Sequence, residues 1–250
     1  YKSATELNAR MKLAEGREDF HTLSWLQYAN LMLGNFDEAK QNVEWAKQAA
    51  DRNPTNAGIR NGYLGMRARL ILETEDWRAL AEASSASSAP GAPDAHAGMP
   101  GMSMPDSNVW IFITGYAAAK RGDLKTADSA EAQLRAAREK LEAGQNPFSA
   151  KYVAVMEKQV GALLRNARGQ KDVALQLAKE AMDIELSMSP PSGPADPFKP
   201  APEFYGELLI EAGKHAEAVA ALELSLQRTP NRTPSVRALQ RARSTGTAMR

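Results

Sequence analysis

The sequence predicts an all-α protein that forms an α/α solenoid of about five helical hairpins. Three observations predict this fold class. A short corner motif recurs along the chain, apolar residues at helical spacing flank each copy, and two segments rich in proline, glycine or serine separate groups of helices. A solenoid is a stack of similar helix pairs, so these features indicate structure repeated along the chain rather than one central core.

The corner motif is a glycine followed five residues later by an alanine. It occurs at Gly34, Gly122, Gly169 and Gly213, and a degenerate copy has Glu75 and Leu80 instead. Glycine permits the left-handed backbone that ends a helix, and alanine lets two helices approach closely. Successive copies lie 41, 47, 47 and 44 residues apart, so each predicts one helical hairpin. The fourth hairpin is predicted as helices over 154–168 and 171–187.

The interruptions define the predicted organisation of the chain. Residues 84–107 are rich in Ser, Ala, Gly, Pro and Met and are predicted to form a loop, and residues 189–202 hold six prolines and are predicted to run extended with Phe198 as a packing anchor. The predicted segments are 1–83 (an N-terminal helical remnant and two hairpins), 84–107 (loop), 108–188 (two hairpins), 189–202 (proline-rich), 203–243 (a last hairpin and a final helix) and 244–250 (a frayed tail). Leu7, Met11 and Ala14 have helical spacing, which predicts the end of a helix from a longer protein.

Composition excludes several classes of function. Lys and Arg number 31 against 30 Asp and Glu, so no overall positive field favours nucleic acid or anionic lipid. The chain has no cysteine, which excludes disulfides and thiolate metal sites. No apolar run approaches the roughly 18 residues that span a bilayer, so no membrane insertion is expected.

The corners and their flanking helices resemble the tetratricopeptide repeat family, whose unit has 34 residues. Gly206, Gly213, Ala218 and Pro230 match the family pattern in the last copy, and Gly34, Phe36, Ala39 and Ala46 match it in the first. The spacing of 41 to 47 residues exceeds the family unit, so the copies are divergent and joined by longer links. The segments around EDFHTLSWLQYANLMLGNFDEA and GPADPFKPAPEFYGELL are also similar to the C-terminal half of a group of bacterial tetratricopeptide proteins.

The resemblance implies a concave groove lined by the first helix of each pair. Matching positions are rich in aromatic residues and methionine, which suit adaptable protein contacts. The expected partner-binding residues are His21, Trp25, Tyr28, Met32, Met66, Arg69, Phe112, Tyr116, Lys120, Gln159 and Asn166, and the same face includes Glu73, Met156, Leu163, Phe204, Glu207 and Glu211. The alternative is that about half of these residues pack in the interior.

The best-known peptide-binding site of the family is a cluster of Lys, Arg and Asn side chains that bind a C-terminal carboxylate. The positions that match this cluster hold Ser24, Tyr28, Gly65, Arg69, Phe112 and Tyr116 instead. Binding of chaperone tails is therefore not expected.

The predicted loop contains the sequence His96-Ala-Gly-Met99-Pro-Gly-Met102-Ser-Met104. Soft thioethers beside an imidazole suit Cu(I), so a copper-handling function is one alternative. The other interpretation is that these methionines only pin the loop onto the helices.

No motif for nucleophilic or metal-dependent catalysis occurs, so the chain is not expected to be an enzyme. The leading hypothesis is a scaffold or adaptor that binds a partner protein or peptide of unknown identity, with Trp25, Tyr28, Phe112 and Tyr116 as anchors. A structural subunit of a larger assembly is a further alternative. The absence of cysteine, the Ala- and Pro-rich links and the resemblance favour an exported, periplasmic bacterial protein over a cytoplasmic one.

Overall fold

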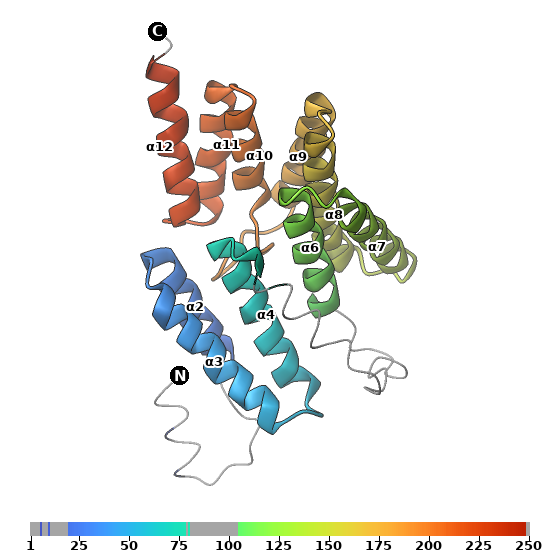
Figure 1. The fold of residues 1–250 in the computed structure, drawn as a ribbon, viewed down its shortest axis with the longest axis vertical. Coiled ribbons are helices and arrows are strands. Elements are labelled where there is room, and N and C mark those ends of the chain that lie inside the picture. The colour runs from blue at the N-terminus through green and yellow to red at the C-terminus, as the bar shows by residue number, and fades with distance from the viewer. Residues whose placement is uncertain (1–5, 7–9, 11–19, 79, 81–104, 249–250) are drawn as a thin grey trace. The chain divides into compact units, whose positions relative to one another are not determined.

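The computed structural model describes residues 6, 10, 20–78, 80 and 105–248, and these residues form ten α-helices and no β-strand (Figure 1). The predicted all-α class is confirmed. The helices are α2 (Phe20–Leu33), α3 (Phe36–Arg52), α4 (Ala57–Thr74), α6 (Pro105–Lys120), α7 (Leu124–Ala143), α8 (Pro147–Ala167), α9 (Lys171–Leu186), α10 (Ala201–Glu211), α11 (His215–Arg228) and α12 (Thr233–Ala248).

The chain divides into two compact units, and each is described by itself. The first comprises the residues up to Trp110 apart from Met32–Gly34, and the second comprises Met32–Gly34 and the residues from Ile111 onwards. In the first unit, the apolar sides of α2, α3 and α4 meet in a small core of Leu23, Val43, Ala46 and Met66. Asn56 caps the start of α4, because its side chain accepts a hydrogen bond from Ile59 N at 3.2 Å.

In the second unit, helices pack mainly against their neighbours in the sequence. The contacting pairs include α7 with α8, α8 with α9, α10 with α11, and α11 with α12 (Figure 1). The largest core cluster includes Val155, Ala181, Leu209, Leu222 and Ala238, which come from successive helices. The packing is therefore distributed along the chain, as expected for helical hairpins in series.

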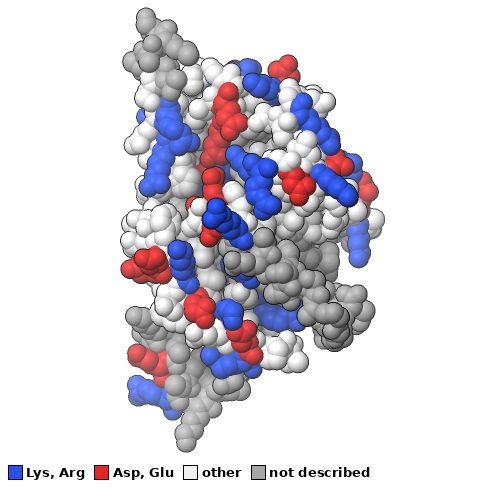
Figure 2. Space-filling view, viewed as in Figure 1, with Lys and Arg blue, Asp and Glu red and all other residues white. Residues whose placement is uncertain are grey.

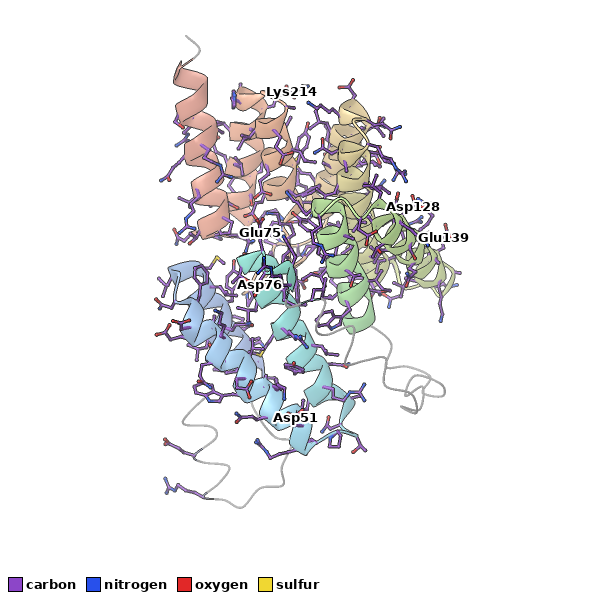
Figure 3. All side chains as sticks on the ribbon, viewed as in Figure 1. Asp51, Glu75, Asp76, Asp128, Glu139 and Lys214 are labelled. Atoms are coloured by element: carbon purple, nitrogen blue, oxygen red, sulfur yellow. The ribbon has the colours of Figure 1, made fainter. Side chains whose placement is uncertain are left out.

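The predicted corners have the backbone that the motif requires. Gly34, Gly122, Gly169 and Gly213 have φ between 74° and 80°, and Glu75 has φ 53°. The residue after each glycine donates its backbone N–H to the carbonyl five residues earlier, as in Asp123 N to Ala118 O at 2.9 Å, which is the Schellman bond that ends a helix. The alanines of the motif, Ala39, Ala127, Ala174 and Ala218, are all buried. Figure 3 labels Glu75 and Asp76 at one corner and Lys214 at another.

Three predicted boundaries differ from the structure. Residues 105–107 of the predicted loop belong to α6, while residues 81–104 lie outside the described part of the chain. Helix α10 begins at Ala201 and includes Pro202, because proline is tolerated in the first helical turn. The predicted frayed tail is helical as far as Ala248, since α12 continues beyond residue 243. The second helix predicted after Glu75 lies largely outside the described residues.

The segment that links α9 to α10, residues 187–200, is here called the strap. It contains no helix, yet Ala195, Pro197 and Lys199 are buried. Phe198, the predicted anchor, is only half-buried. The prolines explain the extended course, because proline cannot donate a backbone hydrogen bond and restricts the residue before it to extended conformations.

Candidate partner-binding surfaces

Helix α2 places the first group of predicted groove residues at or near the surface of the first unit. His21 is exposed and its ring centroid lies 5.0 Å from that of Trp25, which is 42% exposed. Tyr28 is half-buried, and the neighbouring Leu26 is exposed. Met32, at the end of the helix, is half-buried as well and is grouped with the second unit. The helix carries no charged residue. His21, Trp25, Leu26 and Tyr28 are here called the α2 surface.

Two of the predicted groove residues of α4 lie in the interior of the same unit, and a third, Glu73, is half-buried. Met66 and Arg69 are both buried. The Arg69 guanidinium lies 5.3 Å from the centroid of the Tyr28 ring, a cation–π distance, and the Gln27 side chain donates a hydrogen bond to Met66 O at 2.8 Å. These two residues therefore hold α2 against α4 and are not available to a partner.

Phe112 and Tyr116, two of the predicted anchors, are interior residues of the second unit. Their exposed fractions are 1% and 2%. Their rings lie edge to face at 5.6 Å between centroids, and Tyr116 lies 6.2 Å from Phe204 of α10. The prediction that they face a partner is corrected, because Phe204 from a distant part of the sequence packs against the same side of α6. Met156, Leu163 and Phe204 are buried as well.

The polar groove residues of the second unit differ in burial. Lys120 is exposed and Gln159 is fully buried. Asn166 is half-buried and its side chain donates a hydrogen bond to the Glu211 carboxylate at 3.2 Å. A cavity of about 260 Å³ lies beside this pair, and its lining includes Lys171, Leu175 and Leu208. The cavity is small for a drug-sized ligand and combines one cation, one carboxylate and apolar walls.

A buried ionic network around Lys199 was not predicted from the sequence. Its ammonium donates to Glu203 Oε1 and to Glu207 Oε1, both at 2.8 Å. Glu203 is fully buried and also accepts two hydrogen bonds from Arg232, at 2.7 and 3.0 Å, and one from Ser235. The signal that would have found part of this network is the four-residue spacing of Lys199, Glu203 and Glu207.

Protonation states follow from this geometry. Burial opposes ionisation of Glu203, but Arg232 and Lys199 outweigh it and hold the pKa of that carboxyl below its usual range. Burial alone would lower the pKa of Lys199, yet Glu203 and Glu207 hold it well above the ordinary value. The Lys199 amine is thus expected to be protonated at neutral pH, and a protonated amine is not a nucleophile.

A second polar cluster holds both ends of the strap. Glu185 of α9 is buried, and its two oxygens accept hydrogen bonds from Ala201 N at 2.6 Å and Arg228 Nε at 3.3 Å. The remaining Arg228 nitrogens donate to Met188 O at 3.1 Å and Ser189 O at 3.3 Å. The Glu185–Arg228 pair is here called the neck of the strap. Burial raises the pKa of Glu185 to about 7.

The predicted copper ligands His96, Met99, Met102 and Met104 lie outside the described residues. Within the residues that the structure describes, no group of three or more His, Asp or Glu side chains is arranged to hold a metal ion. No described helix is both long and apolar enough to cross a bilayer. No protein-family model, curated protein or solved structure matches this chain.

Proposed function

We propose that this chain is a non-enzymatic scaffold of tandem helical hairpins, of the tetratricopeptide type, and that it binds a partner protein through the α2 surface. The repeated corners support the type of repeat, because four of them combine a left-handed glycine with a buried alanine five residues later. Packing between successive helices also supports it.

The exposed Trp25 carries the proposal for the binding surface. Trp25 is 42% exposed, its ring makes a tilted contact with that of His21, and its helix carries no charged residue. It therefore offers a large apolar contact area at low ordering cost. Tryptophan is also enriched among the residues that dominate binding energies at protein interfaces. The buried residues Met66, Arg69, Phe112, Tyr116 and Gln159 form no part of this surface.

Replacement of Trp25 tests the proposal. A photo-crosslinking amino acid at Leu26 in the otherwise native protein would capture the partner for identification by mass spectrometry. Trp25→Ala is then expected to weaken binding of that purified partner by about 2 kcal/mol or more, a loss of about thirtyfold, because the anchor is removed.

Phe148→Ala provides the matched control. Phe148 is an exposed aromatic residue on α8 of the second unit, with 63% exposure, so its loss should leave the affinity unchanged. Circular dichroism should show the same helicity for both variants. Equal affinities of Trp25→Ala and the natural protein would reject the α2 surface.

A further inference from the structure

Gln159 of α8 and Glu207 of α10, in the second unit, both bind Lys199 of the strap. Gln159 of α8 donates its side-chain N–H to Lys199 O at 2.9 Å, and Glu207 of α10 accepts from the Lys199 ammonium at 2.8 Å. Both are positions that the repeat pattern assigns to a binding groove. The residue that they bind, Lys199, belongs to the same chain.

The contacts to Lys199 comprise one to its backbone and two to its side chain, the two kinds of contact that could also bind an extended peptide. Pro200 has φ −55° and ψ 128°, and a residue that precedes proline is restricted to an extended backbone. Gln159 binds the backbone carbonyl of this extended segment, while Glu203 and Glu207 bind its side-chain ammonium. One hydrogen bond therefore recognises the main chain of the segment, and two recognise the positive charge of its lysine.

The carboxylates give the site its preference for a cation. Glu203 and Glu207 lie four residues apart on α10 and share one face of the helix. Glu203 retains Arg232 as a partner if Lys199 leaves, whereas Glu207, with 24% of its side chain exposed, would lose the ammonium that it binds. Lys120 attracts Glu207 more weakly. A segment that replaces Lys199 must therefore bring its own positive charge.

Stability alone does not require a charged residue at this position. Buried ion pairs can often be replaced by apolar side chains of similar size at no loss of stability, because desolvation of the charges cancels their attraction. The ends of the strap are fixed independently at the neck, where Glu185 binds Ala201 N and Arg228 binds Met188 O and Ser189 O. Release of Lys199 would thus leave α9 and α10 tethered.

We infer that Lys199 is the chain's own occupant of a peptide site formed by Gln159, Glu203 and Glu207, and that an extended, lysine-containing segment of a partner competes with it. The strap then limits access to the site. This inference shares with the proposed function only the idea that the chain binds protein. It concerns a different surface from α2.

The test uses a fluorescent peptide with the strap sequence Ser189–Pro200, added to the full chain, with binding followed by fluorescence anisotropy. The natural protein should bind it weakly because Lys199 fills the site. Lys199→Ala should bind it about tenfold or more tightly than the natural protein. The same peptide with methionine in place of its lysine should lose that gain, and so should Glu207→Gln combined with Lys199→Ala.

Two controls make the result specific. Lys158→Ala removes a lysine of α8 that pairs with Glu180 of α9, away from the Lys199 contacts, and should bind as the natural protein does. Trp25→Ala, combined with Lys199→Ala, should keep the gain, so that failure of the α2 surface is distinguishable from failure of this site. If Lys199→Ala loses its helicity, a variant with residues 190–199 replaced by a Gly/Ser linker of equal length takes its place.

Equal binding by the natural protein and the opened variant would overturn the inference, because the strap would not be blocking a site. Equal binding of the lysine and methionine peptides would overturn it as well, because the carboxylates would not be selecting a cation.

Discussion

Buried charges distinguish individual residues of the second unit from the alanine- and leucine-rich packing around them. Glu203 and Arg232 are 0% and 1% exposed, and their two hydrogen bonds join the start of α10 to the corner before α12. Such a pair adds little net stability when intact. Its disruption is costly, because one charge is then left in a poorly solvating interior.

Arg232→Ala should therefore lower the free energy of unfolding by about 3 to 5 kcal/mol, as measured by urea denaturation monitored by circular dichroism. Arg243→Ala is the control, because Arg243 pairs with Glu223 in an exposed ion pair at 2.7 Å. Its loss should cost less than about 1 kcal/mol. Similar losses for the two variants would contradict the assignment of Glu203–Arg232 as a buried pair.

The neck of the strap should make stability depend on pH near neutrality. Burial raises the pKa of Glu185 from the ordinary value of 4.5, which applies to the unfolded chain, to about 7 in the folded protein. The folded state then binds a proton that the unfolded state releases, so this contribution is complete below about pH 4.5 and is lost as pH rises through about 7. The expected loss is about 3 kcal/mol.

Urea denaturation at a series of pH values between 4 and about 8 checks this dependence. Glu185→Gln keeps an oxygen that can accept from Ala201 N but cannot ionise, so its stability should vary less over the same range. A variant with the same slope as the natural protein would show that other groups cause the dependence.

Among the helices, the corners were predictable because their signal is local. Each corner ends a helix with a glycine in the left-handed conformation, and the alanine that completes the motif lies only five residues later. The glycines are Gly34, Gly122, Gly169 and Gly213. The helix pair predicted at 154–168 and 171–187 is observed as α8 and α9, with α8 starting earlier at Pro147. Periodicity therefore identified these helices more reliably than it located their ends.

The interior of the second unit was not predictable in the same way. Tyr116 has the spacing of a groove residue, but its burial depends on Phe204, which lies far away in the sequence. Lys199 looks like a solvated charge in a proline-rich link, and only the tertiary structure brings Glu203, Glu207 and Gln159 around it. Sequence spacing indicates which residues share a face, but not what covers that face.

The corner between α7 and α8 was missed because it lacks the usual glycine. Gln145 has φ 55° there, and Asn146 N donates to Leu141 O at 2.9 Å, so the backbone is the same as at the predicted corners. A side chain in the left-handed region costs about 1 to 2 kcal/mol that glycine avoids.

Gln145→Gly should accordingly raise the free energy of unfolding by about 1 kcal/mol. Gln133→Gly, within α7, is the control and should lower it by about 1 kcal/mol, because glycine is unfavourable in the middle of a helix. Denaturation in urea measures both changes. Destabilisation by both substitutions would show that the Gln145 side chain contributes contacts that offset its backbone strain.

Charge over the whole sequence, and contacts among the described residues, are both distributed rather than concentrated. In the face shown in Figure 2, basic and acidic side chains lie interspersed, in agreement with the net charge of +1. Contacts between sequence neighbours dominate the second unit, and the first has a core of its own. Local contacts of this kind favour rapid folding, since little chain entropy is lost before they form.

The single ion pair at the neck of the strap has a consequence for how this protein can change over time. Because Glu185 and Arg228 fix residues on both sides of the strap, insertions or exchanges between Ser189 and Pro194 would not disturb the helices that it joins. Residues 189–194 are thus the part of the strap in which the sequence can change while the joined helices, and the contacts of Lys199 further along the strap, stay the same.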